Sequence, residues 1–416
     1  MKTLTMVIWF LLMLQLFGAM DVPHAYLLLS MTPILVSEFL RKSKFKNYFV
    51  LLFLGLFINA LSCKYFRGQS IALTLRGDSN FFYILFYFVF KKYNFSIPKM
   101  EKILCFLAVV FCACYIVQFI IYPVNMFLGP QDSWMYKEEG LRIRMIGQGL
   151  SSLGYFFGLN KYLRKKKHET FYLLLSILCF GTIFLMGFRT MLAAIAVFSL
   201  VMIIRVKGFS WKLFFYGALL CGIFIGALQV PIFAQKMDSM LQRQKTEVLT
   251  NKEYVRVKQF QYFTQKHFKN TWEYVFGSGI PFVRPKTGSA QDFVGSDYGR
   301  KMKVLTDKSN INFVDFGLLS MSWAIGVPAV LAMIAYSFKA YRLKVSSDYY
   351  YLGVWFAYLV ASSFTTLEFC RKGNFVIQAL VLYLVEKAHS AYLHENQRAS
   401  LSPSPPQLQL QGKVSG

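Results

Sequence analysis

Thr170–Ile204, which reads TFYLLLSILCFGTIFLMGFRTMLAAIAVFSLVMII, contains one charged residue, Arg189, in 35 positions. A single helix of that length would be about 50 Å long, because an α-helix rises about 1.5 Å per residue. About 20 apolar residues are enough to cross a hydrocarbon core about 30 Å thick. We therefore predict two membrane-crossing helices that fold back at Gly187-Phe188-Arg189-Thr190, with Arg189 at the membrane surface.

Similar apolar runs recur along the whole chain and predict a polytopic, all-α membrane protein. Apolar residues make up 56% of the 416 positions and charged residues only 16%, which is less charge than a soluble domain carries. Short alternating strands, which a transmembrane barrel would need, are not evident. About twelve membrane spans are predicted. The runs are Leu4–Met20, Ala25–Leu40, Asn47–Cys63, Phe81–Phe90, Ile103–Val124, Met145–Leu163, Phe171–Gly187, Thr190–Ile204, Trp211–Phe233, Asn312–Tyr336, Tyr349–Leu367 and Asn374–Val385.

The formal net charge of +26 lies mainly in short connectors between these runs. If the short run Phe81–Phe90 spans the membrane, all the basic connectors fall on one side. Basic connectors mark the cytoplasmic side, so both termini are predicted inside. No RNP-like, zinc-finger or basic-helix signature is present, so a nucleic-acid partner is not predicted. The basic connectors are Arg41–Lys46, Lys91–Lys102, Lys161–His168, Arg205–Lys212 and Lys339–Lys344.

Lys236–Asn310 is the one long polar segment, and the same topology places it outside. It holds 14 Lys and Arg against 7 Asp and Glu, so 14 − 7 gives +7. A basic segment between two spans predicts an anionic ligand close to the bilayer. We accordingly divide the chain into an N-terminal transmembrane bundle (1–233), a large outer loop (234–311), C-terminal transmembrane helices (312–388) and a disordered, Pro/Ser/Gln-rich cytoplasmic tail (389–416).

Arginines near the predicted outer face are the first candidate site residues. Arg189 is costly near hydrocarbon and is a functional candidate for that reason, although an arginine can also extend to the headgroups. Arg142 and Arg144 precede the next span beside Glu138 and Glu139. They are either ligand-binding residues or part of a surface ion-pair cluster, which would contribute little stability.

The long segment and its exit supply the other candidates. Arg256 lies in a helix-like stretch that begins at Glu253 and continues to about Trp272. It ends at Phe276-Gly277-Ser278-Gly279, where a turn is favoured over a phosphate loop. His267 is more typical of a solvated face residue than of a general base. Asp315 lies just inside the next span, either as a helix cap or as a functional acid.

No metal site, disulfide framework or cofactor is predicted. The seven cysteines lie mostly inside apolar runs, and Lys236–Asn310 contains none of them.

The order of these motifs resembles the O-antigen ligase/polymerase family of bacterial membrane glycosyltransferases, over about 142–329. Phe188-Arg189-Thr190 resembles the family's Ser-Arg-Thr at the start of a span. Arg256 followed by Gly277-Ser278-Gly279 resembles its long-loop Arg and Gly-x-Gly. Asp315-Phe316, followed after nine residues by Gly326, resembles His-Asn, nine residues and Gly-x-x-Gly. Asp replaces His, Phe replaces Asn and Ala329 stands at the second Gly. The missing His counts against the ligase branch more than against the polymerase branch.

The resemblance implies a GT-C-like, metal-independent enzyme of the bacterial inner membrane, with its active face periplasmic. Donor and acceptor would be glycans on undecaprenyl diphosphate, with membrane lipid and a chain-length regulator as further partners. A ligase that transfers glycan to a lipid A core or a protein is an alternative, and a lipid-linked glycan flippase or another transporter is a second. The catalytic residues would be Arg256, Asp315 and Arg189, and the substrate-binding residues Arg142, Arg144, Lys258, Lys308 and Asn312.

Overall fold

The computed structural model describes residues 37–39, 41–127, 133–135, 142–208, 215, 222, 255–285, 293–309, 311–313, 316–364, 366–371 and 373–401. Within these ranges the chain is helical apart from two short antiparallel ribbons, β1–β2 and β3–β4. The predicted run 4–20, most of 25–40 and of 211–233, and Asp315 lie outside the described residues.

Four helices in this part of the chain are long and apolar enough to cross a membrane. They are α3 (Lys46–Arg67), α6 (Ile97–Ile121), α8 (Glu169–Met186) and α9 (Arg189–Lys207). Each coincides with a predicted run, so the prediction of a helical membrane protein is confirmed at this level.

The break between α8 and α9 falls where the sequence predicted it. Gly187 ends α8 in the left-handed conformation, with φ 73°, and its N–H donates to the Phe184 carbonyl at 3.0 Å. This is a conformation that glycine adopts without steric cost. Phe188 is the extended N-cap residue of α9, and Arg189 is the first residue of that helix.

Three other predicted segments differ from the structure. The run 81–90 is not one helix: a 3₁₀ segment η1 (Asp78–Leu85) follows the short α4 (Ile71–Gly77) and leads into α5 (Phe86–Tyr93). The run 312–336 breaks at Gly326 into α15 (Leu318–Ile325) and α16 (Val327–Arg342). The helix α18 (Asn374–Leu401) continues through 389–401, where a disordered tail was expected.

The break at Gly326 has a tertiary cause. Its φ is 89°, and a Cβ there would lie 2.6 Å from the Phe276 carbonyl oxygen. The backbone of the polar segment therefore packs directly on the α15–α16 junction. No sequence periodicity could have indicated this approach.

Small residues let the helices of the bundle pack closely. The helix α7 (Gly149–Leu163) lies against α6 and α8. A Cβ on Gly154 would come within 2.7 Å of the Ala108 Cβ, and one on Gly158 within 2.5 Å of the Ser176 Oγ. The small-xxx-small spacing at 154 and 158 is thus a helix-packing feature, as expected.

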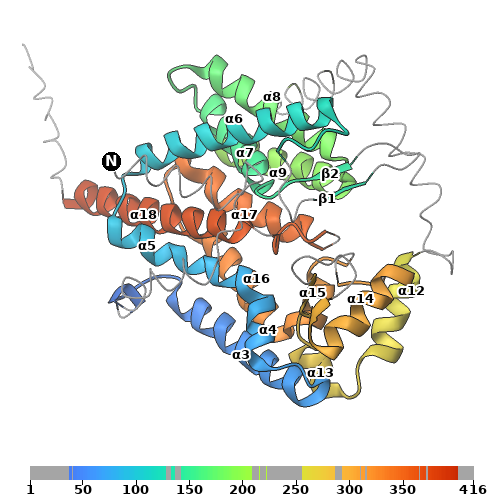
Figure 1. Cartoon of the computed structure of the whole chain (residues 1–416). Helices are drawn as coiled ribbons and strands as arrows, with labels where there is room; N and C mark the ends of the chain where they lie inside the picture. Colours follow the sequence, from blue (N-terminus) through green and yellow to red (C-terminus); the bar gives the residue numbers. More distant parts are fainter. Residues whose placement is uncertain are drawn as a thin grey trace, which may run out of the picture.

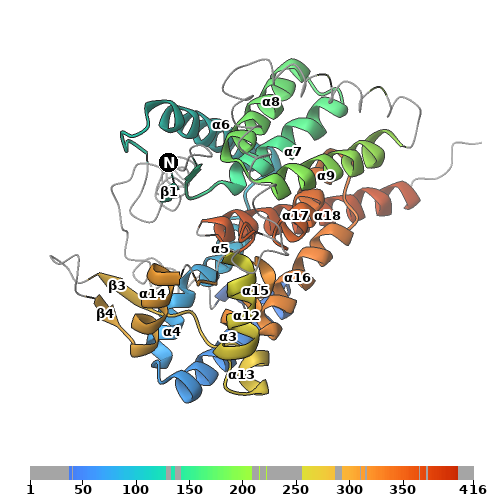
Figure 2. The same cartoon turned by 90° about the vertical axis from the view of Figure 1, so that its right-hand side faces the viewer.

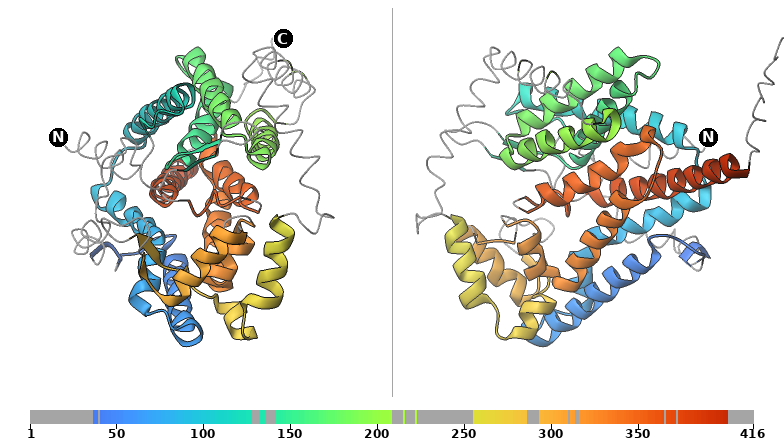
Figure 3. Two further views of the ribbon diagram at one scale, coloured as in Figure 1. Left: turned by 45° about the vertical axis from the view of Figure 1, so that its right-hand side comes forward. Right: turned by 180° about the vertical axis from the view of Figure 1, so that it is seen from behind.

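The basic connectors meet at one end of the bundle, which we call the connector end. Lys91 Nζ donates to the Lys42 carbonyl at 2.7 Å, and Lys161 pairs with Glu101 at 2.7 Å. The guanidinium of Arg205 lies 4.5 Å from the centre of the Tyr341 ring. Figures 1 and 3 show α6–α9 on one side of α17 (Tyr350–Ser362) and α18, with α3 and α16 on the other.

At the opposite end, which we call the loop end, α3 terminates and α7, α9, α15 and α18 begin. The loop segment, meaning the described residues 255–285 and 293–309, packs there against α3 and α15 (Figure 2). Its elements are α12 (Val255–Gln261), the π-helical turn η2 (Tyr262–His267), α13 (Thr271–Phe276), β3 (Val283–Pro285), β4 (Phe293–Gly295) and α14 (Asp297–Ser309). The other ribbon, β1 (Ser133–Met135) with β2 (Arg142–Arg144), lies beside α8.

Candidate functional site

A buried polar cluster, here called the Glu368 cluster, lies at the loop end where α7 and α18 begin. It comprises Gln148, Glu368, Arg371 and Asn374. Gln148 is the N-cap residue of α7, Asn374 is the first residue of α18, and the other two belong to the connector between α17 and α18. Glu368 and Asn374 are fully buried.

Glu368 is the centre of this cluster. Its carboxylate accepts from Gln148 Nε2 at 2.6 Å and lies 3.5 Å from Arg371 Nε. Asn374 Nδ2 donates to the Glu368 backbone carbonyl at 2.5 Å. Burial raises the pKa of Glu368, while Arg371, Asn374 and Gln148 oppose that rise. A buried carboxylate held in this way fixes the guanidinium beside it.

Arg371 connects the cluster to the predicted site at Arg189. One Arg371 nitrogen donates to Gln148 Oε1, and the guanidinium lies 5.0 Å from the centre of the Phe188 ring. Phe188 immediately precedes Arg189, which is half-buried at the start of α9. Gln148 also approaches Met191, one residue past Thr190, with Nε2 3.7 Å from the sulfur. The start of α9 is therefore packed on the Glu368 cluster.

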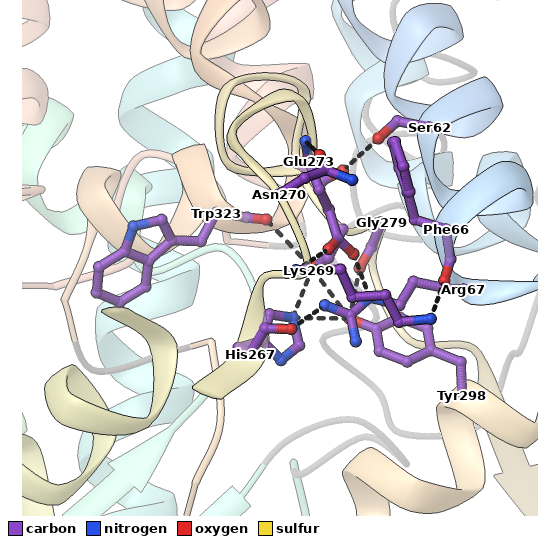
Figure 4. A network of polar contacts seen from close by, with 12 residues as sticks. Ser62, Phe66, Arg67, His267, Lys269, Asn270, Glu273, Gly279, Tyr298 and Trp323 are labelled. Atoms are coloured by element: carbon purple, nitrogen blue, oxygen red, sulfur yellow. Dashed lines mark hydrogen bonds and ion pairs between the residues drawn. The ribbon is translucent and has the colours of Figure 1, made fainter. Parts of the chain in front are cut away.

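A second polar cluster, here called the loop cluster, lies where the loop segment meets the end of α3. It comprises Arg67, His267, Glu273, Ser278 and Tyr298, and Figure 4 labels all of these except Ser278. Arg67, the last residue of α3, forms an ion pair with the buried Glu273 and donates to the His267 carbonyl. His267 Nε2 lies 2.9 Å from Ser278 Oγ, and Tyr298 donates to the same Oγ at 3.0 Å.

Local sequence explains why Glu273 is in place for Arg67. Asn270 caps α13, because its side chain accepts from the Glu273 N–H at 2.9 Å. The Glu273 carboxylate accepts in turn from the Lys269 N–H at 2.8 Å. The first bond is an N-cap, and the second ties the N3 carboxylate to the N–H of the residue before the cap. One carboxylate thus closes the start of a helix and joins the loop segment to α3.

The surroundings of His267 keep its ring neutral. Its side chain is buried, and burial together with the nearby Arg67 charge lowers its pKa to about 3. The expectation of a solvated face residue was wrong, because aromatic rings cover it: Phe263 and Phe268 both lie 4.9 Å from it, centre to centre.

Gly277-Ser278-Gly279 forms a turn that packs against the bundle. The sequence favoured a turn here over a phosphate-binding loop. Ser278 N–H donates to the Trp323 carbonyl at 2.9 Å, and Gly279 N–H to the Ala324 carbonyl at 2.8 Å. Both N–H groups donate to carbonyls near the end of α15, so they do not point toward a ligand. A Cβ on Gly277, whose φ is 82°, would lie 2.5 Å from the Gly326 nitrogen.

The structure brings only some of the predicted site residues together. Arg256 is half-buried on α12, one turn before Phe260, whose ring lies 5.9 Å from that of Phe316. The helix with Arg256 therefore lies against the residue after Asp315, although Asp315 itself is outside the described residues. Lys258 is exposed on α12, as is Lys308 on α14.

Asn312 is half-buried between α14 and α15. Arg142 and Arg144 are on β2, and their side chains lie outside the described part of the structure. Ile143 between them is buried, and its carbonyl accepts from the Tyr115 hydroxyl at 3.1 Å.

The sequence pattern did not indicate Gln148, Glu368, Arg371 or Arg67 as site residues. The only available signal was the charged connector between the last two apolar runs, which contains Glu368 and Arg371. The described residues contain no group of three or more His, Cys, Asp or Glu side chains that could hold a metal ion. No known protein-family model matches the chain, and no curated protein matches it.

Proposed function

We propose that the protein is a membrane glycosyltransferase that polymerises polysaccharide repeat units. Its substrates are glycans carried on undecaprenyl diphosphate, and the loop end faces the periplasm of the bacterial inner membrane. The proposal rests on the motif order that resembles the O-antigen ligase/polymerase family. The observation that supports it best is the Glu368 cluster, which fixes the Arg371 guanidinium against the residue before Arg189.

The chemistry requires fixed cations at the membrane surface. The bond between the donor sugar and its diphosphate breaks, and the electron pair leaves with the diphosphate. An acceptor hydroxyl oxygen forms the new glycosidic bond and gives up its proton. Guanidiniums bind diphosphate oxygens in a bidentate manner and stabilise the charge that develops on them.

We assign that role to Arg189 and Arg371, with Glu368 as a positioning residue that holds Arg371. Arg256 is a further diphosphate ligand, and Asp315 accepts the acceptor proton, as the resemblance implies. Arg142, Arg144, Lys258, Lys308 and Asn312 contribute to substrate binding.

The test measures polymer length in cells in which the chromosomal gene is deleted and a variant is supplied in its place. Arg189→Lys and Arg371→Lys keep the charge but lose the planar fork. Each is expected to lower chain extension by roughly 10²–10³ and to leave single lipid-linked units accumulating. Arg398→Lys, on the exposed end of α18, is the matched control and should give wild-type polymer.

Wild-type polymer from both variants, at wild-type protein levels, would contradict the proposal. Accumulation of full-length lipid-linked polymer that is not passed to another acceptor would instead indicate a ligase.

A further inference from the structure

A small basic pocket lies at the connector end, away from the site proposed above. Its volume is about 150 Å³, and it lies between the ends of α9 and α16, the start of α17 and the middle of α18. Three cationic residues line it, Arg205, Arg342 and Lys344, together with Tyr341, Tyr350 and Tyr392. No aspartate or glutamate is among the described residues that line it.

Neighbouring side chains contact the Arg205 guanidinium and the Lys344 backbone. The Arg205 guanidinium lies 4.5 Å from the centre of the Tyr341 ring and 5.3 Å from that of Tyr350. The Lys344 backbone is fixed by His389, whose Nδ1 donates to the Lys344 carbonyl at 2.7 Å. Stacked guanidiniums keep their N–H edges available to oxygen ligands. These features favour an anion with several oxygen atoms, such as a phosphate group.

The surfaces that lead to the pocket are apolar. Val197, Leu200 and Ile204 lie on one face of α9 and are 40–56% exposed, directly before Arg205. Leu331 and Phe338 are 55% and 57% exposed on α16, in the turns before Arg342. Two apolar helix faces therefore end at one basic pocket, which is the arrangement that an acyl chain and its headgroup require.

The size of the pocket separates a lipid from a soluble ligand. Sites that enclose a small molecule are typically about 300–1,000 Å³. A pocket of about 150 Å³ is too small for a nucleotide but suits one phosphate headgroup. The acyl chains of a lipid would lie outside it, along the exposed faces of α9 and α16. We propose that this pocket binds the headgroup of an anionic phospholipid, a site independent of the proposed glycosyltransferase chemistry.

The experiment compares purified full-length protein in nanodiscs of phosphatidylcholine alone and of phosphatidylcholine mixed with phosphatidylglycerol. The wild type is expected to unfold at a higher temperature in the mixture and to retain phosphatidylglycerol in native mass spectrometry. Each cation near an anionic surface contributes roughly fivefold in affinity. The triple variant R205Q/R342Q/K344Q should therefore bind phosphatidylglycerol on the order of 100-fold more weakly.

The matched control is K165Q/K167Q/K207Q, which removes the same charge from three exposed residues at the same end. It should keep wild-type retention. Equal losses in both triple variants would overturn the proposal in favour of general surface charge. Stabilisation of the wild type by sodium phosphate alone, equal to that by phosphatidylglycerol, would overturn it in favour of a soluble anion. Arg205→Lys, which keeps the charge, should show an intermediate loss even if the triple variant folds poorly.

Discussion

At the scale of single residues, burial decides what His267 can do. A histidine with a pKa near 3 is neutral throughout the physiological range and is too weak a base to remove a proton from a sugar hydroxyl. Its Nε2 is hydrogen-bonded to the Ser278 hydroxyl, which also accepts a hydrogen bond from the Tyr298 hydroxyl. His267 therefore belongs to the packing of the loop segment.

This burial predicts that the loop segment loses stability in acid. The folded-state pKa of His267 is about 3 and the unfolded value about 6.5, so the unfolded chain binds more protons between these pH values. Stability is present above about pH 6.5 and falls as the pH falls toward 3. Between pH 7 and pH 5 the loss is about 2 kcal/mol. Thermal unfolding and the rate of protease cleavage in the loop segment measure it.

His267→Gln should remove most of that pH dependence, whereas His394→Gln, at an exposed histidine on α18, should leave it unchanged. The same slope in wild type and His267→Gln would show that other groups cause the acid sensitivity.

At the scale of elements, the loop segment is joined to the bundle by side chains of α3. Asn59 Nδ2 donates to the Phe276 carbonyl at 2.7 Å and to the Ala324 carbonyl at 2.9 Å. Ser62 Oγ donates to the Gly277 carbonyl at 3.0 Å. The Phe276 carbonyl lies directly before the glycine turn, and the Ala324 carbonyl belongs to α15. The Asn59 amide therefore bonds to both sides of the contact between the turn and α15.

Asn59→Ala is expected to destabilise the docked loop segment by about 2–3 kcal/mol, because it removes two hydrogen bonds and leaves the Ala324 carbonyl with Gly279 N–H alone. Ser62→Ala removes one such bond and should cost about half as much. Thermal unfolding and protease sensitivity of the loop segment report both effects. If Ser62→Ala proved as damaging as Asn59→Ala, the loss would not follow the number of hydrogen bonds.

Elements that the local sequence pattern defines were predicted correctly. The α8–α9 hairpin follows from one charge and one glycine inside a long apolar run. The break at Gly326 could not be predicted in this way, because its cause is the close approach of the Phe276 carbonyl, which lies 50 residues earlier in the chain. The Glu368 cluster could not be predicted either, since Gln148 and Glu368 lie 220 positions apart and meet only after folding.

At the scale of the whole molecule, the two ends of the bundle differ in chemistry. The connector end joins the basic connectors through pairs such as Lys166 with Asp348 at 2.6 Å. The loop end carries the loop segment, whose described residues hold nine Lys and Arg against three Asp and Glu, so 9 − 3 gives +6. Both ends are basic, so net charge alone does not distinguish them. Short connectors, however, obey the positive-inside bias, while long loops cross the membrane largely regardless of charge.

This difference predicts the orientation of the protein. Reporter fusions at Lys166 and Lys207, both at the connector end, should report the cytoplasm. A fusion at Thr287, which lies outside the described residues but within the predicted outer loop, should report the periplasm. The helices α8 and α9 are each long and apolar enough to cross a membrane once, so residues 166 and 207 are expected to report the same side whatever the total number of spans. If the fusion at Thr287 reported the same side as the fusion at Lys166, the Glu368 cluster would lie away from periplasmic substrates. That single result would remove the basis for a periplasmic polymerase, while leaving the fold unchanged.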